Sequence, residues 1–219
     1  MSNKAIIVSG GALNEELVLN TIRRAENPCI IGVDKGVEFL YEHQIIPSYI
    51  VGDFDSLSRD IVDYYKNETK VPIREYNPVK DASDTEIAVR LGVTLGCEKI
   101  LILGATGGRI DHLWANVQTL MIPFKAGVEA VILDSQNRIR LIGEETHLRK
   151  EDAYGPYFSL FPLGEPVYGL TLEGAKYPLS EHTMTASDSL CVSNQIEEDE
   201  VVVNFRSGIV ILMETRDKK

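Results

Sequence analysis

The chain has 219 residues, of which 44% are hydrophobic and 25% charged, and its net charge is −11. This length and composition suit a globular protein of one large or two small domains. The acidic balance excludes the basic footprint of a nucleic-acid-binding protein. No apolar run approaches the roughly 20 residues of a membrane span, and the N-terminus becomes polar too early for a signal peptide. We therefore expect a cytoplasmic protein that binds neither nucleic acid nor membrane.

Segments of two kinds alternate over residues 1–135. Strand-like apolar runs occupy residues 5–9, 29–33, 48–51, 71–75, 99–103 and 128–133. Helical periodicity marks residues 14–26, 84–95 and 111–125, the last containing Trp114, which we expect to pack in the core. This alternation predicts a Rossmann-like α/β domain, with a parallel sheet and helices on both faces.

The pattern changes over residues 136–219. Short β-rich runs occupy residues 138–142, 157–161, 167–172, 189–192, 201–205 and 209–213, and turn residues separate most of them. No helix-length periodic segment intervenes. We predict a smaller all-β sandwich domain here. Cys29, Cys97 and Cys191 are widely spaced beside apolar runs, which favours buried thiols over disulfides or a zinc site.

Short acidic motifs follow several of the predicted strands in the first domain. The carboxyl ends of strands in an open α/β sheet line one crevice, so we expect these motifs to converge. Carboxylates that converge repel one another unless a cation lies among them. The sequence therefore predicts a site for a Mg²⁺–nucleotide complex.

Asp53 and Asp55 are two residues apart, so in extended chain both carboxylates point to the same side, where they could bind one Mg²⁺ ion. The alternative is a surface turn in which Asp55 and Ser56 cap a helix starting near residue 58. Asp81 offers a third carboxylate. It precedes a capping box formed by Ser83 and Glu86 at a helix start, where free N–H groups suit a phosphate.

A glycine-rich loop follows the strand at 99–103. Gly107 and Gly108 allow the backbone to approach an anion closely, and Arg109 supplies a permanent charge for phosphate. Asp111 is either the N-cap of the next helix or a group near the reacting hydroxyl. In the second domain, Tyr177 could stack on a flat heterocycle whose polar edge Ser193 and Asn194 would bind; turns are the alternative.

The motifs resemble those of the thiamin pyrophosphokinase (thiamine diphosphokinase) family in its bacterial form. The matching stretches, in order, are residues 52–57, 80–86, 104–116, 157–179 and 193–194. The resemblance implies an ATP-binding α/β domain followed by a thiamine-binding β-sandwich, in a homodimer with thiamine near the subunit interface. It also implies transfer of the diphosphate of ATP to the thiamine hydroxyl, with release of AMP.

The resemblance also implies residue roles. The Mg²⁺ ligands are Asp53, Asp55 and Asp81. Together with Arg109 and Asp111, they make up the catalytic residues. The nucleotide contacts are Asp34, Asp84, Thr106, Gly107, Gly108 and Arg109, and the thiamine contacts are Asp111, Tyr177, Ser193 and Asn194. Lys35 departs from the family pattern, which commonly has glycine there.

Two other functions remain open at this point. One is a different Mg²⁺-dependent phosphoryl or nucleotidyl transferase that uses the same crevice on another alcohol, for which Tyr177, Ser193 and Asn194 would be dispensable. The other is a non-catalytic sensor of thiamine or nucleotide. A sensor would have no need for the acidic set at 53, 55, 81 and 111.

Overall fold

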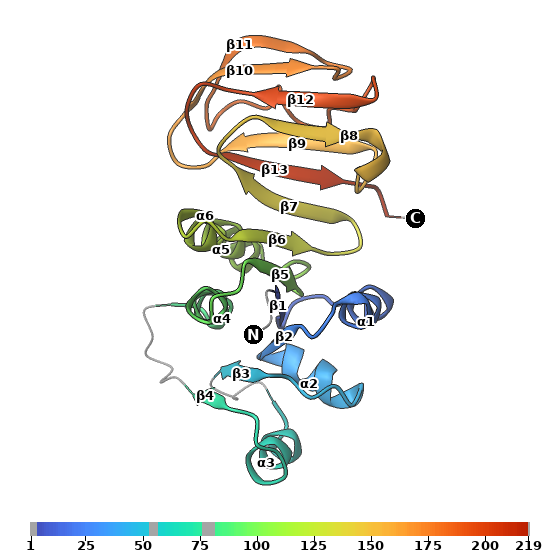
Figure 1. Cartoon of the computed structure of the whole chain (residues 1–219), viewed down its shortest axis with the longest axis vertical. Helices are drawn as coiled ribbons and strands as arrows, with labels where there is room; N and C mark the ends of the chain where they lie inside the picture. Colours follow the sequence, from blue (N-terminus) through green and yellow to red (C-terminus); the bar gives the residue numbers. More distant parts are fainter. Residues whose placement is uncertain (1–3, 53–56, 76–81, 219) are drawn as a thin grey trace. The chain divides into compact units, whose positions relative to one another are not determined.

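The structure, a computed structural model, describes residues 4–52, 57–75 and 82–218. The chain divides into two compact units, residues 1–135 and 136–219 (Figure 1). Asp53, Asp55 and Asp81 lie outside the described residues. Within the described ranges, no helix is both long and apolar enough to span a membrane.

Unit 1 is a parallel sheet with strand order β4-β3-β2-β1-β5-β6. Its strands are β1 (Lys4–Val8), β2 (Cys29–Val33), β3 (Tyr49–Gly52), β4 (Ile73–Glu75), β5 (Lys99–Leu103) and β6 (Glu129–Leu133). Its helices are α1 (Glu15–Arg24), α2 (Lys35–Glu42), α3 (Arg59–Asn67), α4 (Asp84–Thr94), α5 (Ile110–Thr119) and α6 (Met121–Lys125).

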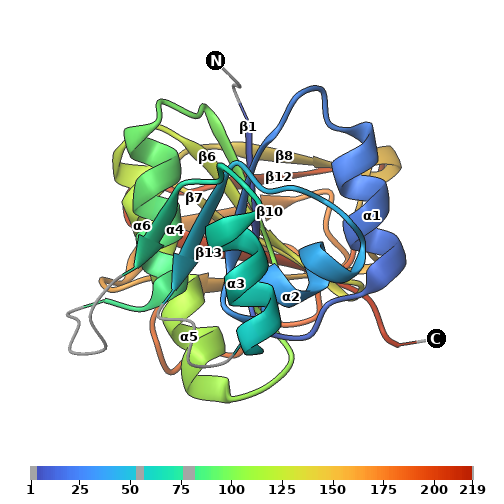
Figure 2. The same ribbon diagram turned by 90° about the horizontal axis from the view of Figure 1, so that it is seen from below.

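Helices cover both faces of this sheet, which is why its central strands are apolar throughout. Figures 1 and 2 show α1 and α2 on one side and α4, α5 and α6 on the other. Val18 of α1 and Leu40 of α2 pack against Ile6 and Val8 of β1. Burial of both faces of β1 explains an unbroken apolar run where a half-exposed strand would alternate.

The loops after β1 and β5 are joined by main-chain hydrogen bonds. Ser9 N–H donates to the Leu103 carbonyl at 2.8 Å, Gly11 N–H to the Gly104 carbonyl at 2.8 Å, and Ala12 N–H to the Thr106 carbonyl at 2.9 Å. A Cβ added at Gly11 would lie 2.4 Å from the Gly104 carbonyl oxygen. Glycine at position 11 is therefore required for the two loops to meet.

Unit 2 is an antiparallel β-sandwich. One layer has the order β7-β13-β9 and the other β11-β10-β12-β8. The strands are β7 (Asn137–Ile142), β8 (Thr146–Arg149), β9 (Tyr157–Pro162), β10 (Val167–Glu173), β11 (Leu179–Met184), β12 (Glu200–Asn204) and β13 (Val210–Thr215), with a 3₁₀ turn η1 (Lys150–Asp152). Side chains from both layers share one core, which includes Leu160, Leu172 and Leu212.

The predicted fold class, a parallel α/β part followed by an all-β sandwich, is confirmed, but several elements differ from expectation. The helix expected over 111–125 is two helices, because Pro123 has no N–H to donate to the carbonyl of residue 119. Residues 189–192 form turns rather than a strand. Trp114 is 49% exposed rather than part of the core. Helix α2 and strands β8 and β11 were not expected.

The start of α2 lies against the end of β1, and this contact yields a test of the fold. A Cβ at Gly36 would lie 2.0 Å from the carbonyl oxygen of Val8. Alanine normally stabilises a helix relative to glycine. Here we expect Gly36→Ala to lower the free energy of unfolding by about 2 kcal/mol, because α2 must move away from β1. Urea denaturation measures the change.

The matched control for this prediction is Gly108→Ala. A Cβ at Gly108 meets no atom within 4 Å. Its free energy of unfolding should stay within about 0.5 kcal/mol of the unsubstituted protein. Equal unfolding midpoints for the two variants would contradict the close approach of α2 to β1.

Candidate active site

A cavity of about 830 Å³ lies in unit 1 at the carboxyl ends of the strands. Its volume is within the usual range for small-molecule sites. Helix α1 follows β1 on one face and α5 follows β5 on the other, so the cavity lies at the topological switch point where such sheets bind ligands. The lining residues are 9–12, Asp34, Lys35, Asp84, Thr85, 104–109, His112, Leu113 and Asn116.

Asp34 joins β2 to α2 at the edge of this cavity. Its backbone has φ 48° and ψ −129°, a conformation that residues with a side chain rarely adopt. Its carbonyl accepts the Val37 N–H at 2.9 Å. A Cβ at Gly10 would lie 3.2 Å from the Cβ of Asp34, so the loops after β1 and β2 are closely packed. Such strain often occurs at binding sites.

The first turn of α4 faces the cavity through Asp84 and Thr85. The Ser83 hydroxyl accepts the Glu86 N–H at 3.2 Å, as the capping box predicts. The Glu86 carboxylate instead binds Arg90, at 2.9 Å from Nε. A buried hydrogen bond of 2.7 Å between the Ser9 and Thr85 hydroxyls ties this helix start to the end of β1. The positive end of the α4 dipole is thereby held at the cavity.

The loop between β5 and α5 forms the opposite wall. Gly107 has φ 70°, and a Cβ there would lie 2.4 Å from the Cβ of Ala12. The Thr106 hydroxyl donates to the Asp134 carboxylate, which follows β6. The amide of Asn116, a buried residue of α5, donates to the Ala105 carbonyl at 2.9 Å. Side chains behind the loop therefore hold it while its glycines keep the backbone accessible.

Arg109 and Asp111 form an exposed ion pair at the start of α5. Arg109 Nε is 3.1 Å from Asp111 Oδ1, and Nη2 is 2.5 Å from Oδ2. Arg109 is the N-cap residue, so Asp111 lies in the first turn. Hydrogen bonding to Arg109 is the main cause that lowers the pKa of Asp111. Asp111 is therefore a charged acceptor at neutral pH.

The predicted residues of unit 2 come together next to β9. Ser193 has φ 57°, and its N–H donates to the Ser159 hydroxyl at 3.0 Å. Tyr177 N–H donates to the Asn194 side-chain oxygen at 3.0 Å. Burial raises the pKa of the Cys191 thiol to about 11, so it is protonated at neutral pH and suited to packing.

The structure thus brings the predicted nucleotide contacts to one cavity: Asp34, Asp84, Thr106, Gly107, Gly108 and Arg109 all line it. Tyr177, Ser193 and Asn194 form a separate group in unit 2. No cluster of three or more potential metal-binding side chains occurs in residues 4–52, 57–75 and 82–218, and the predicted ligands Asp53, Asp55 and Asp81 lie outside these ranges.

Sequence reasoning missed the loop at 9–12, Asn116 and Asp134. The pair Gly10-Gly11 directly after an apolar run was a usable signal for the loop. Asn116 and Asp134 carry no local signal, because their partners are distant in sequence: Asn116 binds Ala105, 11 positions away, and Asp134 binds Thr106, 28 positions away. Their hydrogen bonds support the cavity wall.

Two family models match the chain. Residues 23–132 match "Thiamin pyrophosphokinase, catalytic domain" and residues 145–210 match "Thiamin pyrophosphokinase, vitamin B1 binding domain". The curated thiamine pyrophosphokinase of Bacillus subtilis is 33% identical over 193 residues, which cover 88% of this chain and 89% of that protein.

Solved structures show the same similarity. The crystal structure of the Bacillus subtilis thiamine pyrophosphokinase has a TM-score of 0.87 at 30% identity, covering 98% of this chain and 100% of that one. The thiamin pyrophosphokinase of Geobacillus thermodenitrificans has a TM-score of 0.84 at 31% identity, covering 99% of each chain. With both domains matched in order, the chain belongs to the thiamin pyrophosphokinase family.

Proposed function

We propose that this chain transfers the diphosphate of ATP to the hydroxyl of thiamine, with thiamine diphosphate and AMP as products. The reaction is that of the family. The observation that carries the proposal for this chain is the cavity at the switch point, where glycine loops, a helix start and Arg109 converge. We also propose that the protein works in the cytoplasm.

The triphosphate of ATP would lie along the loop at 104–109 and the first turn of α4. Backbone N–H groups at Gly107 and Gly108 and the N-terminal end of α4 suit phosphate oxygens. Arg109 adds a permanent positive charge at the rim. Asp34 and Asp84, which also line the cavity, would contact other parts of the nucleotide.

Asp53, Asp55 and Asp81 would hold Mg²⁺. Strand β3, which pairs with β2, ends at Gly52, so Asp53 and Asp55 come directly after it in the sequence; β2 in turn leads into Asp34. Carboxylate oxygens are suitable Mg²⁺ ligands. The ion, when bound, would neutralise negative charge on the phosphates being transferred.

Asp111 would receive the thiamine hydroxyl. Because its pKa is lowered, its carboxylate is ionised at neutral pH and would accept a hydrogen bond from that hydroxyl. Such a bond aligns the oxygen for attack on the phosphorus of the transferred group. Diphosphoryl transfer depends mainly on positioning and charge neutralisation, so this set of residues needs no covalent nucleophile.

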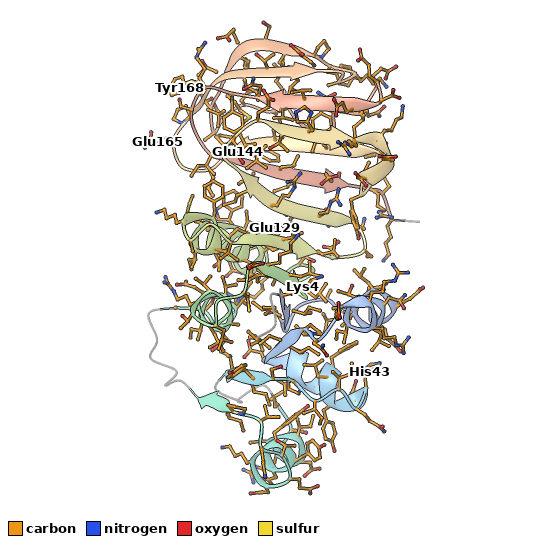
Figure 3. The ribbon with its side chains drawn as sticks, viewed as in Figure 1. Lys4, His43, Glu129, Glu144, Glu165 and Tyr168 are labelled. Atoms are coloured by element: carbon orange, nitrogen blue, oxygen red, sulfur yellow. The ribbon has the colours of Figure 1, made fainter. Side chains whose placement is uncertain are left out.

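Thiamine itself would contact Tyr177 and Ser193, which are both exposed residues of the second unit. We further propose a homodimer with this site near the subunit interface. Exposed apolar side chains support it: Ile110 is 79% exposed on α5, and Tyr168 on β10 is also exposed (Figure 3). Ile110 and Trp114 lie one turn apart on α5, on either side of Asp111 in sequence.

The first prediction concerns the products. The purified protein with thiamine, ATP and Mg²⁺ should form AMP and thiamine diphosphate in equal amounts, quantified by chromatography. Chelation with EDTA should abolish turnover because the carboxylates need the cation. ADP and thiamine monophosphate as products would be consistent with the nucleotide site but would contradict diphosphoryl transfer.

The metal ligands give a separate test. Asp55→Ala should lower kcat by at least about 100-fold. Turnover near the unsubstituted rate would contradict the assignment of Asp55 as a Mg²⁺ ligand.

A second prediction concerns Tyr177. Replacing it with alanine removes the aromatic surface for the heterocycle, a contribution of about 1.4 kcal/mol. We expect Tyr177→Ala to raise KM for thiamine about tenfold and to leave KM for ATP within about twofold. Steady-state kinetics with each substrate varied in turn would measure both. Equal increases in the two KM values would exclude the stacking role.

The third prediction concerns assembly. Light scattering after size exclusion should give a mass of about twice 24.4 kDa. Trp114→Asp places a charge on the exposed apolar face of α5 and should shift the mass towards that of the monomer. The matched control is Ile46→Asp, since Ile46 is exposed outside that face. A dimer unaffected by Trp114→Asp would exclude this face as the interface.

A further inference from the structure

The side chain of Asn194 makes three hydrogen bonds inside the chain. Its Oδ1 accepts the N–H groups of Tyr177 at 3.0 Å and Gln195 at 2.9 Å, and its Nδ2 donates to the Tyr177 carbonyl at 2.8 Å. Both lone pairs of Oδ1 are thereby used. Asn194 is 1% exposed. The side-chain oxygen is therefore saturated, and burial shields the amide from any bound molecule.

These bonds fix both main-chain polar groups of Tyr177. Tyr177 lies between the end of β10 at Glu173 and the start of β11 at Leu179, so no strand pairing holds it. One side chain, 17 positions later in the chain, takes the place of a strand partner. Tyr177 as a residue remains 57% exposed. The backbone is thus held while the ring faces outwards.

The main chain of Asn194 is itself anchored to β9. Its N–H donates to the Phe158 carbonyl, and its carbonyl accepts the Phe158 N–H, both at 2.9 Å. The preceding residue, Ser193, has φ 57° and is held through its N–H by the buried Ser159. Asn194 therefore joins three parts: strand β9, the exposed Ser193 and the exposed Tyr177.

We infer that Asn194 is a positioning residue that holds Tyr177 for the flat heterocycle of thiamine without touching thiamine itself. The inference rests on the proposed function for the identity of the ligand. It reassigns Asn194 from the direct contact expected from the sequence to a role through Tyr177. Recognition of the thiamine ring would then depend on the buried side-chain amide of Asn194, through its bonds to the backbone of Tyr177.

The chemistry of the asparagine amide explains why this residue type suits the position. Aspartate accepts the two N–H groups but cannot donate to the Tyr177 carbonyl, which its carboxylate would repel. Alanine leaves the Tyr177 and Gln195 N–H groups without these acceptors. Asn194→Asp therefore removes one of the three bonds with little change in volume, and Asn194→Ala removes all three.

The test is a double-mutant cycle of Asn194→Ala and Tyr177→Ala, with Asn194→Asp as a milder variant. We expect each Asn194 variant to raise KM for thiamine, by about tenfold for alanine, with KM for ATP within about twofold. In the Tyr177→Ala background, Asn194→Ala should add less than about twofold. Asn204→Ala is the matched control, because the Asn204 amide binds Glu145 elsewhere in unit 2, and it should leave both KM values unchanged.

Three outcomes would overturn the inference. Multiplicative losses in the double variant would show that Asn194 contacts thiamine independently of Tyr177. Equal increases in KM for thiamine and ATP would show a general structural role. Thiamine affinity unchanged in both Asn194 variants would remove any role. Calorimetric titration with thiamine measures the affinity of the same variants without turnover. If the protein binds thiamine but forms no product, the proposed reaction is refuted, while the binding data still test the role of Asn194.

Discussion

The hydrogen bonds between the loop after β1 and the loop after β5 are the constraint on which the site depends. The adjacent strands β1 and β5 lead into helices on opposite faces of the sheet, so a crevice forms between the two loops. Three main-chain bonds, from Ser9, Gly11 and Ala12, keep the loops together. Residues 9–12 and 104–106, which include all the partners in these bonds except Leu103, also line the cavity.

If ATP binds in this cavity, as proposed, a protein with a net charge of −11 binds a polyanion there, and the local geometry must make this possible. The first turn of α4 presents the positive end of a helix dipole, and Arg109 brings a permanent charge. In the ion pair with Arg109, Asp111 offsets part of that charge. A phosphate near Arg109 would compete with Asp111 for the guanidinium, which would leave the carboxylate available to the thiamine hydroxyl.

Sequence patterns predict the elements whose signal is local. The strands at 29–33 and 99–103 have the bounds that their sequence predicts, because both are continuous apolar runs. Helix α2 escapes such a prediction since Gly36 disfavours a helix, yet its missing Cβ is what lets α2 meet the Val8 carbonyl. Tertiary contact here overrides local propensity, which no window of neighbouring residues could reveal.

The same distinction separates the two groups of candidate site residues, one in each unit. The nucleotide side is built from short glycine-containing motifs that follow strands, so local sequence patterns are enough to group its residues. The unit 2 group depends on partners far apart in the chain: Asn194 acts on Tyr177, and Ser159 on Ser193, 34 positions later. The residue type at a position shows only which hydrogen bonds the side chain can form. The fold determines whether the partner is a ligand or another part of the chain. Asn194 shows why this matters, because its side-chain amide is bonded to the main chain of Tyr177 and Gln195 and is buried.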